Sequence, residues 1–183
     1  MVDQLRVSKV ARTIPSGSRI LDIGCGSGLL ISVLPPRSSY TGVDRDTAVV
    51  EADKRRFPYF DFHCLDAVTS LFPFHDEQFD VVVMAAFLEH VDQPKVMFTE
   101  IKRVLKPGGR VLVTTPSRWG GAVHAVLSKL GFLSAEAAEE HQGYWNKKKM
   151  DECLKLTGLH LKWYEPFQFG LNQLFILTRG HHE

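Results

Sequence analysis

The sequence predicts an α/β protein with a single doubly wound sheet of seven strands, mostly parallel and ending in an antiparallel pair. Three observations support this fold class. Apolar segments of strand-like composition alternate with segments of helical periodicity along the chain. The short apolar segment Ile20–Ile23 leads into closely spaced glycines and then into a helical segment, as in βαβ units. The unbroken apolar run Phe79–Met84 is typical of a parallel strand buried on both faces.

Length and composition limit the possible classes of protein. The 183 residues suit one domain, residues 1–183, with a sizeable core. A formal net charge of +1 argues against a nucleic-acid partner held by a basic surface. The three cysteines show no C-x-x-C spacing, so neither a disulfide framework nor a structural zinc site is expected. The sequence shows no signal-peptide pattern and no apolar run long enough to span a bilayer, so we expect a cytoplasmic protein.

The elements can be placed in order along the chain. We expect strands at Ile20–Ile23, Tyr40–Asp44, Tyr59–Leu65, Phe79–Met84, Arg110–Pro116, Leu159–Phe167 and Leu171–Thr178. We expect helices at Val2–Thr13, Leu29–Leu34, Thr47–Phe57, Asp92–Lys106 and Met150–Thr157. In an open sheet of this kind, ligands bind at the carboxyl ends of the strands. The residues that follow the first four strands are therefore the candidates for a binding site.

The glycine loop, residues 24–28, is the first feature that points to a ligand. Gly24, Gly26 and Gly28 give it the spacing G-x-G-x-G. Glycines let a ligand approach the main chain closely, with the N–H groups of the following helix nearby. Asp22, just before the loop, would repel a phosphate but would pair with an ammonium group. The sequence therefore favours a nucleoside with a cationic tail over a dinucleotide, which favours G-x-G-x-x-G.

Asp44 ends the second strand, 18 residues after Gly26. At about this distance, βαβ folds place a carboxylate against the hydroxyl groups of a ribose. The alternative is a role as helix N-cap, for which Asp46 is better placed. We assign Asp44 to ribose binding, and Arg45 to the same cofactor site.

The segment Leu21–Gly28 resembles motif I of the class I S-adenosylmethionine-dependent methyltransferases, and the resemblance covers about residues 18–116. The segment Ala85–Val91 resembles the motif after the fourth strand in the small-molecule branch (type 11) that includes ubiquinone and menaquinone methylases. The resemblance implies a Rossmann-like fold, S-adenosylmethionine as cofactor and S-adenosylhomocysteine as product. It also implies O- or C-methylation of a quinone-, sugar- or lipid-like small molecule.

The resemblance assigns roles to further residues. Asp66 corresponds to an acid that bonds the exocyclic amine of adenine, with the backbone N–H of Ala67 on the ring; a turn-forming Asp66 is the alternative. The backbone near Met84 and Ala85 would face the methionine part of the cofactor. The residues assigned to the cofactor are Asp22, Gly24, Cys25, Gly26, Gly28, Asp44, Arg45, Asp66, Ala67, Met84 and Ala85. Cys25 is interpreted as a small residue that fits the loop rather than as a nucleophile.

The acceptor side of the site is less defined. The sulfonium supplies the driving force, so positioning provides much of the acceleration, and a base is needed only for a hydroxyl acceptor. His90 is the first candidate base and His141 the second, although either can be structural. Glu89 and Tyr144 are assigned to the substrate, and His141 and Tyr144 together resemble an H-x-x-Y element of sugar, lipid or cell-envelope methylases. No cluster of His, Asp and Glu suggests a required metal.

Residues 117–150 are expected to be a variable segment on the substrate side. Trp119, Val123, Val126, Leu127 and Leu130 share one helical face. This segment could form part of the substrate wall, cover the edge of the sheet, or make a peripheral membrane contact. Two other functions stay open: a non-catalytic or regulatory S-adenosylmethionine-binding protein, and a nucleotide-dependent oxidoreductase. A monomer or homodimer is expected, with a small-molecule acceptor as the partner.

Overall fold

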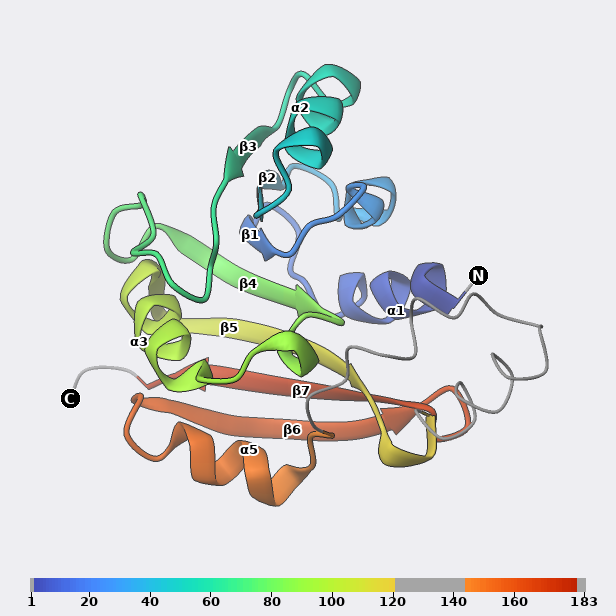
Figure 1. The fold of residues 1–183 in the computed structure, drawn as a ribbon, viewed down its shortest axis with the longest axis vertical. Coiled ribbons are helices and arrows are strands. Elements are labelled where there is room, and N and C mark those ends of the chain that lie inside the picture. The colour runs from blue at the N-terminus through green and yellow to red at the C-terminus, as the bar shows by residue number, and fades with distance from the viewer. Residues whose placement is uncertain (1, 121–143, 181–183) are drawn as a thin grey trace.

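The computed structural model describes residues 2–120 and 144–180, and these residues form one sheet with helices on both faces (Figure 1). The sheet has seven strands in the order β3-β2-β1-β4-β5-β7-β6. Its parallel strands are β1 (Arg19–Ile23), β2 (Ser39–Asp44), β3 (Asp61–Cys64), β4 (Phe79–Ala85) and β5 (Leu105–Pro116). The strands β6 (Leu159–Phe167) and β7 (Asn172–Arg179) pair antiparallel, and β7 also runs antiparallel to β5. The expected doubly wound sheet with a terminal antiparallel pair is confirmed.

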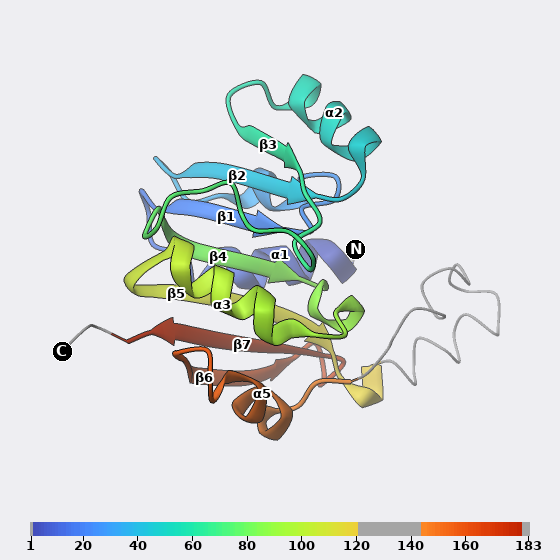
Figure 2. The same ribbon diagram turned by 60° about the vertical axis from the view of Figure 1, so that its left-hand side comes forward.

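Helices cover both faces of the sheet (Figure 2). Each face has its own cluster of buried apolar side chains. On one face lie α1 (Val2–Ala11), the 3-10 helix η1 (Leu29–Val33) and α2 (Thr47–Arg56). On the other face lie α3 (Pro94–Val104) and α5 (Lys147–Leu154). A second 3-10 helix, η2 (Leu88–His90), follows β4. The strand tips that carry the candidate site therefore lie between two packed layers of helices.

Several element boundaries differ from those expected from the sequence. The segment after the glycine loop is a short 3-10 helix because Gly28, at its start, is left-handed and provides no side-chain cap. The strand expected at Tyr59–Leu65 shortens to β3, and Tyr59 is almost fully exposed. Helix α5 begins before the expected Met150 because the Asn146 side chain caps it by accepting a hydrogen bond from the Lys149 N–H.

Two further features bear on function. Within the described ranges 2–120 and 144–180, no helix is long and apolar enough to cross a bilayer. The same part of the chain holds no group of three or more His, Cys, Asp or Glu side chains suited to a metal ion. Of the segment 117–150, the structure describes residues 117–120 and 144–150, so the expectations for its middle lie outside the described residues.

Candidate functional site

The glycine loop is held against the tip of β2 by its own main chain. The N–H groups of Gly24 and Cys25 both donate to the carbonyl oxygen of Val43, over 2.9 and 3.1 Å. All three loop glycines have positive φ, a region that L-residues with side chains rarely adopt. The loop conformation therefore depends on glycine at each of the three positions.

The three glycines differ in what surrounds them. A Cβ at Gly24 would lie 2.4 Å from the Phe87 ring, and one at Gly28 would lie 2.8 Å from the Phe57 ring. A Cβ at Gly26 would meet no heavy atom within 4 Å in the described part of the chain, its two chain neighbours apart. Gly24 and Gly28 thus allow close internal packing, whereas Gly26 borders open space. The absence of a side chain at Gly26 leaves room for a ligand beside the loop.

Asp44 connects this loop with the second strand tip. One carboxylate oxygen, Oδ2, accepts a hydrogen bond from the Gly26 N–H at 3.0 Å, and Oδ1 accepts one from the Asp46 N–H at 3.0 Å. Each oxygen keeps a further lone pair that can accept a bond from a ligand hydroxyl. Asp46 itself caps α2, as the sequence indicated, so Asp44 is not the cap residue. Arg45 follows directly, and its carbonyl oxygen accepts from the Cys64 Sγ.

The third strand tip is tied to the second. The Leu65 N–H donates to the Asp44 carbonyl oxygen over 2.8 Å. The Asp66 carboxylate accepts a hydrogen bond from the Val68 N–H at 2.9 Å, which holds the pKa of Asp66 below its usual value. This is the turn-forming role that the sequence left open, and its adenine-binding role stays a prediction. The neighbouring Ala67 is buried in the core beneath α3.

Asp22 lies deeper than the other acids of the site. It is 4% exposed, and its Oδ2 accepts a hydrogen bond from the Tyr40 hydroxyl at 2.8 Å. Burial raises the pKa of Asp22 to about 7, the Tyr40 bond acts in the opposite direction, and the Asp44 charge raises it further. Burial also raises the pKa of the Cys25 thiol, with the charges of Asp22 and Asp44 adding to the effect. Cys25 is therefore a neutral, buried thiol, as expected for a residue that merely fits the loop.

The fourth strand tip lies next to the glycine loop. Met84 is fully buried and Ala85 is partly buried, and Ala86 has a φ of 57°, which is rare for a residue with a side chain. This backbone is held by a hydrogen bond from the Ala86 N–H to the Thr114 carbonyl oxygen on β5. The strained residue directs the chain into η2, and the Phe87 ring comes to lie against Gly24.

Glu89 and His90 both belong to η2 but differ in exposure. Glu89 is 5% exposed, and burial raises its pKa to about 7. His90 is exposed at the carboxyl end of the same turn. Tyr144 is partly exposed next to the buried Trp145. The second candidate base, His141, lies outside the described residues.

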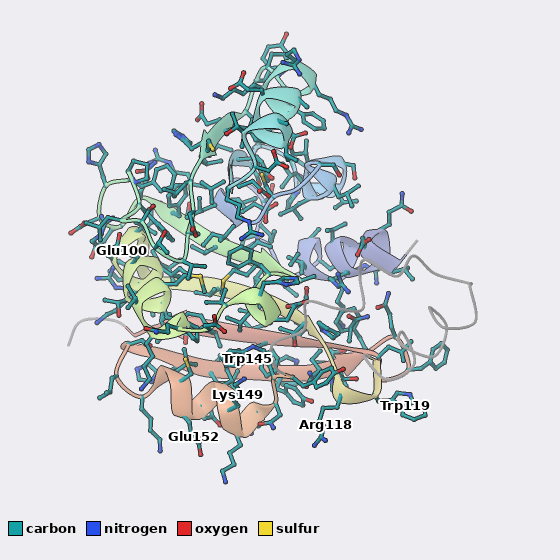
Figure 3. All side chains as sticks on the ribbon, in the orientation of Figure 1. Glu100, Arg118, Trp119, Trp145, Lys149 and Glu152 are labelled. Atoms are coloured by element: carbon teal, nitrogen blue, oxygen red, sulfur yellow. The ribbon has the colours of Figure 1, made fainter. Side chains whose placement is uncertain are left out.

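Trp145 connects the segment before α5 with η2. Its ring N–H donates to the Leu88 carbonyl oxygen at 3.2 Å, and its own carbonyl oxygen accepts from the Gln173 side chain at 3.0 Å. The Lys149 ammonium lies 4.4 Å from the centroid of its ring, and both side chains are seen at the start of α5 in Figure 3. Figure 3 also shows Trp119, which is 64% exposed, just beyond the end of β5. Trp145 thus fixes the turn that carries Glu89.

Several residues of this site were missed from the sequence. Tyr40 contacts Asp22, and Phe87 contacts Gly24. Both are aromatic residues of ordinary appearance in a strand or a turn, so the sequence did not indicate either contact. The Gln93-Pro94 step, in contrast, was recognisable as a helix start. A hollow of about 360 Å³ lies at the amino ends of the strands, between residues 15–18 and 106–110. It is remote from the strand tips, so it does not belong to this site.

Known proteins resemble this chain in both sequence and fold. A family model described as a methyltransferase domain matches residues 21–113. A ubiquinone biosynthesis O-methyltransferase of Idiomarina loihiensis is 30% identical over 77% of this chain and 60% of its own length. One from Xylella fastidiosa is 25% identical over 91% of this chain and 73% of its own length.

A solved structure supports the fold. A S-adenosylmethionine-dependent methyltransferase of Methanosarcina mazei matches with a TM-score of 0.69 and 20% identity, over 95% of this chain and 98% of its own. At this identity the likeness concerns the fold alone. The chain therefore shares its fold with a solved methyltransferase. It spans about three fifths of the length of the Idiomarina relative.

Proposed function

We propose a function for this chain, which belongs to the methyltransferase domain family, the type 11 branch of the class I S-adenosylmethionine-dependent methyltransferases. Its cofactor is S-adenosylmethionine, which supplies an activated methyl group on a sulfonium. We infer that the chain transfers this methyl group to a small-molecule acceptor and releases S-adenosylhomocysteine. Among acceptors, a hydroxyl group is the first candidate, because the relatives are named O-methyltransferases.

The single observation that carries the proposal is the pairing of open space at Gly26 with the Asp44 carboxylate. The Gly26 N–H donates to Asp44 Oδ2, and within the described ranges no heavy atom beyond the chain neighbours lies within 4 Å of the position a Cβ would take. A ribose can thus approach the main chain and use the remaining lone pairs of Asp44. Asp66 and Ala67 would hold the adenine, and Asp22 the ammonium of the methionine tail. The residues present therefore fit this cofactor.

The remaining assigned residues surround this core of the cofactor site. We propose that the main chain at Cys25, Met84 and Ala85 faces the methionine part, and that Arg45 borders the ribose. Glu89 and Tyr144 would contact the acceptor. For a hydroxyl acceptor, His90 would take the proton, with His141 as the second candidate. Rigid placement of the acceptor in line with the methyl group supplies most of the acceleration.

Calorimetry with S-adenosylmethionine, S-adenosylhomocysteine and NAD tests the cofactor assignment. We expect both sulfur ligands to bind and NAD to give no signal. Binding of NAD alone would favour the nucleotide-dependent oxidoreductase. The variants Asp44→Ala and Asp61→Ala form a matched pair, since Asp61 is an exposed acid at the start of β3. Only the first should weaken binding, by about tenfold or more, through lost hydrogen bonds.

A transfer assay with a labelled methyl group tests the reaction. Quinols, sugars, lipids and amines are offered in turn, and we expect label on a hydroxyl-bearing compound. Cofactor binding without transfer to any of these classes would instead favour a regulatory S-adenosylmethionine-binding protein. Sedimentation of the purified chain would test the expected monomer or homodimer. The cytoplasmic location stays a prediction.

A further inference from the structure

Tyr40 and Asp22 lie on neighbouring parallel strands and belong to the same face of the sheet. Tyr40 of β2 lies opposite Ile20 of β1, and two positions further along Gly42 lies opposite Asp22. Figure 2 shows these two strands side by side. Residues two positions apart on a strand point to the same face. Tyr40 is therefore a diagonal neighbour of the carboxyl group that precedes the glycine loop.

Packing fixes the place of the Tyr40 hydroxyl. The Tyr40 ring is 2% exposed, and its centroid lies 5.7 Å from that of Phe60 and 5.8 Å from that of Phe62. A ring packed on two others has little freedom to turn away. Its hydroxyl donates to Asp22 Oδ2 over 2.8 Å. The orientation of the Asp22 carboxyl group is thus set by a donor that is itself held in place.

The Tyr40 bond uses only one of the two Asp22 oxygens. In the described part of the chain no group donates to Oδ1, yet Oδ1 is not one of the buried oxygens that lack a partner. Oδ1 therefore keeps contact with solvent and can accept further hydrogen bonds. The glycine loop follows directly, and Gly26 within it borders open space. Asp22 is held by one oxygen and presents the other at the candidate site.

The titratable groups around this pair come from three elements. Burial raises the pKa of Asp22, the Tyr40 hydrogen bond lowers it, and the Asp44 charge raises it. Burial and the charges of Asp22, Asp44 and Asp53 raise the pKa of the Cys25 thiol, which is therefore neutral. Burial and nearby charges, Asp53 of α2 among them, also raise the pKa of Tyr40. The Tyr40 hydroxyl consequently keeps its proton and remains a donor.

Stability alone does not account for this pair. Burying a carboxyl group costs free energy, and apolar side chains of similar shape are often as stable or more stable in its place. Tyr40 compensates part of that cost at Oδ2, whereas Oδ1 has no protein donor among the described residues. A cationic ligand group beside the glycine loop would supply the second partner.

We infer that Tyr40 is a positioning residue for the methionine tail of the cofactor: its hydroxyl holds Asp22 Oδ2, so that Oδ1 receives the ammonium group. This inference rests on the proposed function, in which Asp22 binds that ammonium. Tyr40 acts through Asp22 and makes no contact of its own with the cofactor. Its hydrogen bond also favours the ionised carboxylate, the form that attracts a cation.

Two ligands test this inference by calorimetry. S-adenosylhomocysteine carries the amino-acid tail, whereas 5′-deoxy-5′-methylthioadenosine has the same adenosine and thioether without it. Tyr40→Phe keeps the aromatic packing and removes only the hydroxyl. At pH 7 we expect this variant to bind S-adenosylhomocysteine about tenfold more weakly and methylthioadenosine with unchanged affinity. Equal losses for the two ligands, or no loss for either, would overturn the inference.

The pH profile separates positioning from packing. Affinity for S-adenosylhomocysteine should rise with pH as Asp22 ionises. Without the Tyr40 donor Asp22 keeps its proton to higher pH, so the midpoint of the rise should move up by about one pH unit in Tyr40→Phe. Titration of the ligand amine is common to both proteins and cancels from the comparison. A packing defect would lower affinity equally at every pH, and an unchanged midpoint contradicts the inference.

Tyr164→Phe is the matched control. The Tyr164 hydroxyl donates to Gln173 Oε1 at 3.0 Å, and its ring lies 5.1 Å from that of Phe175, so this variant also loses one hydroxyl from a packed ring. Tyr164 lies on β6, at the other end of the strand order from β2 and β3. Tyr164→Phe should keep the affinities for both ligands and the pH profile.

A double variant tests whether Tyr40 acts through Asp22. Asp22→Asn has no charge to position, so Asp22→Asn/Tyr40→Phe should bind S-adenosylhomocysteine as Asp22→Asn does. A further tenfold loss in the double variant would show that Tyr40 acts independently of Asp22, which contradicts the inference. Urea unfolding of each variant confirms that the folded protein is being titrated.

Failure of the inference can be told apart from failure of the proposed function. An unsubstituted protein that binds neither ligand contradicts the proposed function. One that binds both with equal affinity contradicts the assignment of Asp22 to the ammonium. A preference for S-adenosylhomocysteine over methylthioadenosine that survives intact in Tyr40→Phe contradicts only the role of Tyr40.

Discussion

At the scale of single residues, Asp22 combines two properties that rarely occur together. It is buried and bonded to Tyr40, yet its position before the glycine loop places it next to the expected cationic tail. With a pKa of about 7, the carboxyl group is mostly protonated in acid and mostly ionised in mild base. Only the ionised form attracts a cation. Cofactor affinity should therefore depend on pH through this residue.

The first prediction follows from that titration. Between pH 6 and pH 8 the ionised fraction of Asp22 rises from about one tenth to about nine tenths, so the affinity for S-adenosylmethionine should rise about tenfold. Calorimetry at fixed ionic strength measures this. In Asp22→Asn the rise should disappear, apart from any titration of the cofactor itself. A profile in Asp22→Asn identical to that of the unsubstituted protein would contradict the role of Asp22.

The second prediction compares two glycines that both have positive φ. Gly26 has a φ of 51° and Gly17 a φ of 77°, and a Cβ at either would meet no heavy atom within 4 Å among the described residues beyond its chain neighbours. Alanine at either site should lower the free energy of unfolding by about 1 kcal/mol. Only Gly26→Ala should weaken S-adenosylhomocysteine binding, because its methyl group would enter the space of the ligand.

Denaturant unfolding and calorimetry on both variants distinguish the two effects. Gly17 lies in the turn before β1, at the opposite edge of the sheet, so it serves as the control for strain alone. Equal losses of affinity in the two variants would mean that strain, rather than space, governs binding.

At the scale of elements, η2 depends on a contact from the far end of the chain. The Trp145 ring donates to the Leu88 carbonyl oxygen, and the turn thus held carries Glu89 and His90. The third prediction is that Trp145→Phe lowers the free energy of unfolding by about 1 kcal/mol through the lost bond. It should also slow methyl transfer while S-adenosylhomocysteine affinity stays unchanged.

The matched control for this variant is Trp163→Phe on β6. Trp163 is 58% exposed, so its replacement should change stability by less than about 0.5 kcal/mol and leave turnover unaltered. Thermal unfolding, calorimetry and the transfer assay provide the three measurements. Normal turnover in Trp145→Phe would show that η2 does not need this anchor.

The elements also show where sequence reasoning succeeds and where it stops. Strands β1 and β4 were predictable because they contain short apolar runs, as buried parallel strands usually do. Strand β2 was predictable because it follows β1 at the spacing of a βαβ unit. Their tips placed Asp44 and Gly26 together, which the Gly26–Asp44 hydrogen bond confirms. The short 3-10 helix η1 was not predictable from apolar spacing alone, because the same spacing also suits an α-helix.

Contacts between distant parts of the chain limit how much of the site can be predicted from the sequence. Arg6 reaches Asn172 across 166 positions, and Trp145 reaches Leu88 across 57. Neither pair carries a local motif. Burial of the Glu89 carboxyl was equally hidden, because a glutamate in a polar-looking turn is ordinarily exposed. The sequence therefore predicted the proximity of Gly26 and Asp44 but not these contacts between distant segments.

At the scale of the whole molecule, the site occupies one edge of a sheet that is otherwise sealed by apolar layers. In this arrangement two carboxyl groups, Asp22 and Glu89, are buried near the proposed cofactor and acceptor residues. Each has a pKa of about 7 in the folded chain, above its ordinary value of 3.8 or 4.5. The unfolded chain releases those protons at lower pH. Folding is therefore linked to proton uptake by these two groups.

The fourth prediction is the sign of the pH dependence of stability. Between about pH 5 and pH 7 the folded state binds more protons than the unfolded state, so the free energy of unfolding should fall as pH rises. The total fall is on the order of a few kcal/mol and should level off above pH 8. Acids with lowered pKa values, such as Asp80 and Glu100, act at lower pH and are already fully ionised in this window.

Urea unfolding of the apo protein at pH 5, 6, 7 and 8 measures this dependence, with Asp22→Asn/Glu89→Gln as the comparison. The free energy of unfolding of the double variant should depend less on pH than that of the unsubstituted chain. At pH 8 the double variant should be the more stable of the two, because it no longer buries two ionised groups. S-adenosylmethionine should offset part of the loss in the unsubstituted chain, because it binds the folded state and favours ionised Asp22. A free energy of unfolding that rises from pH 5 to pH 8 would show that neither carboxyl group is buried in this way.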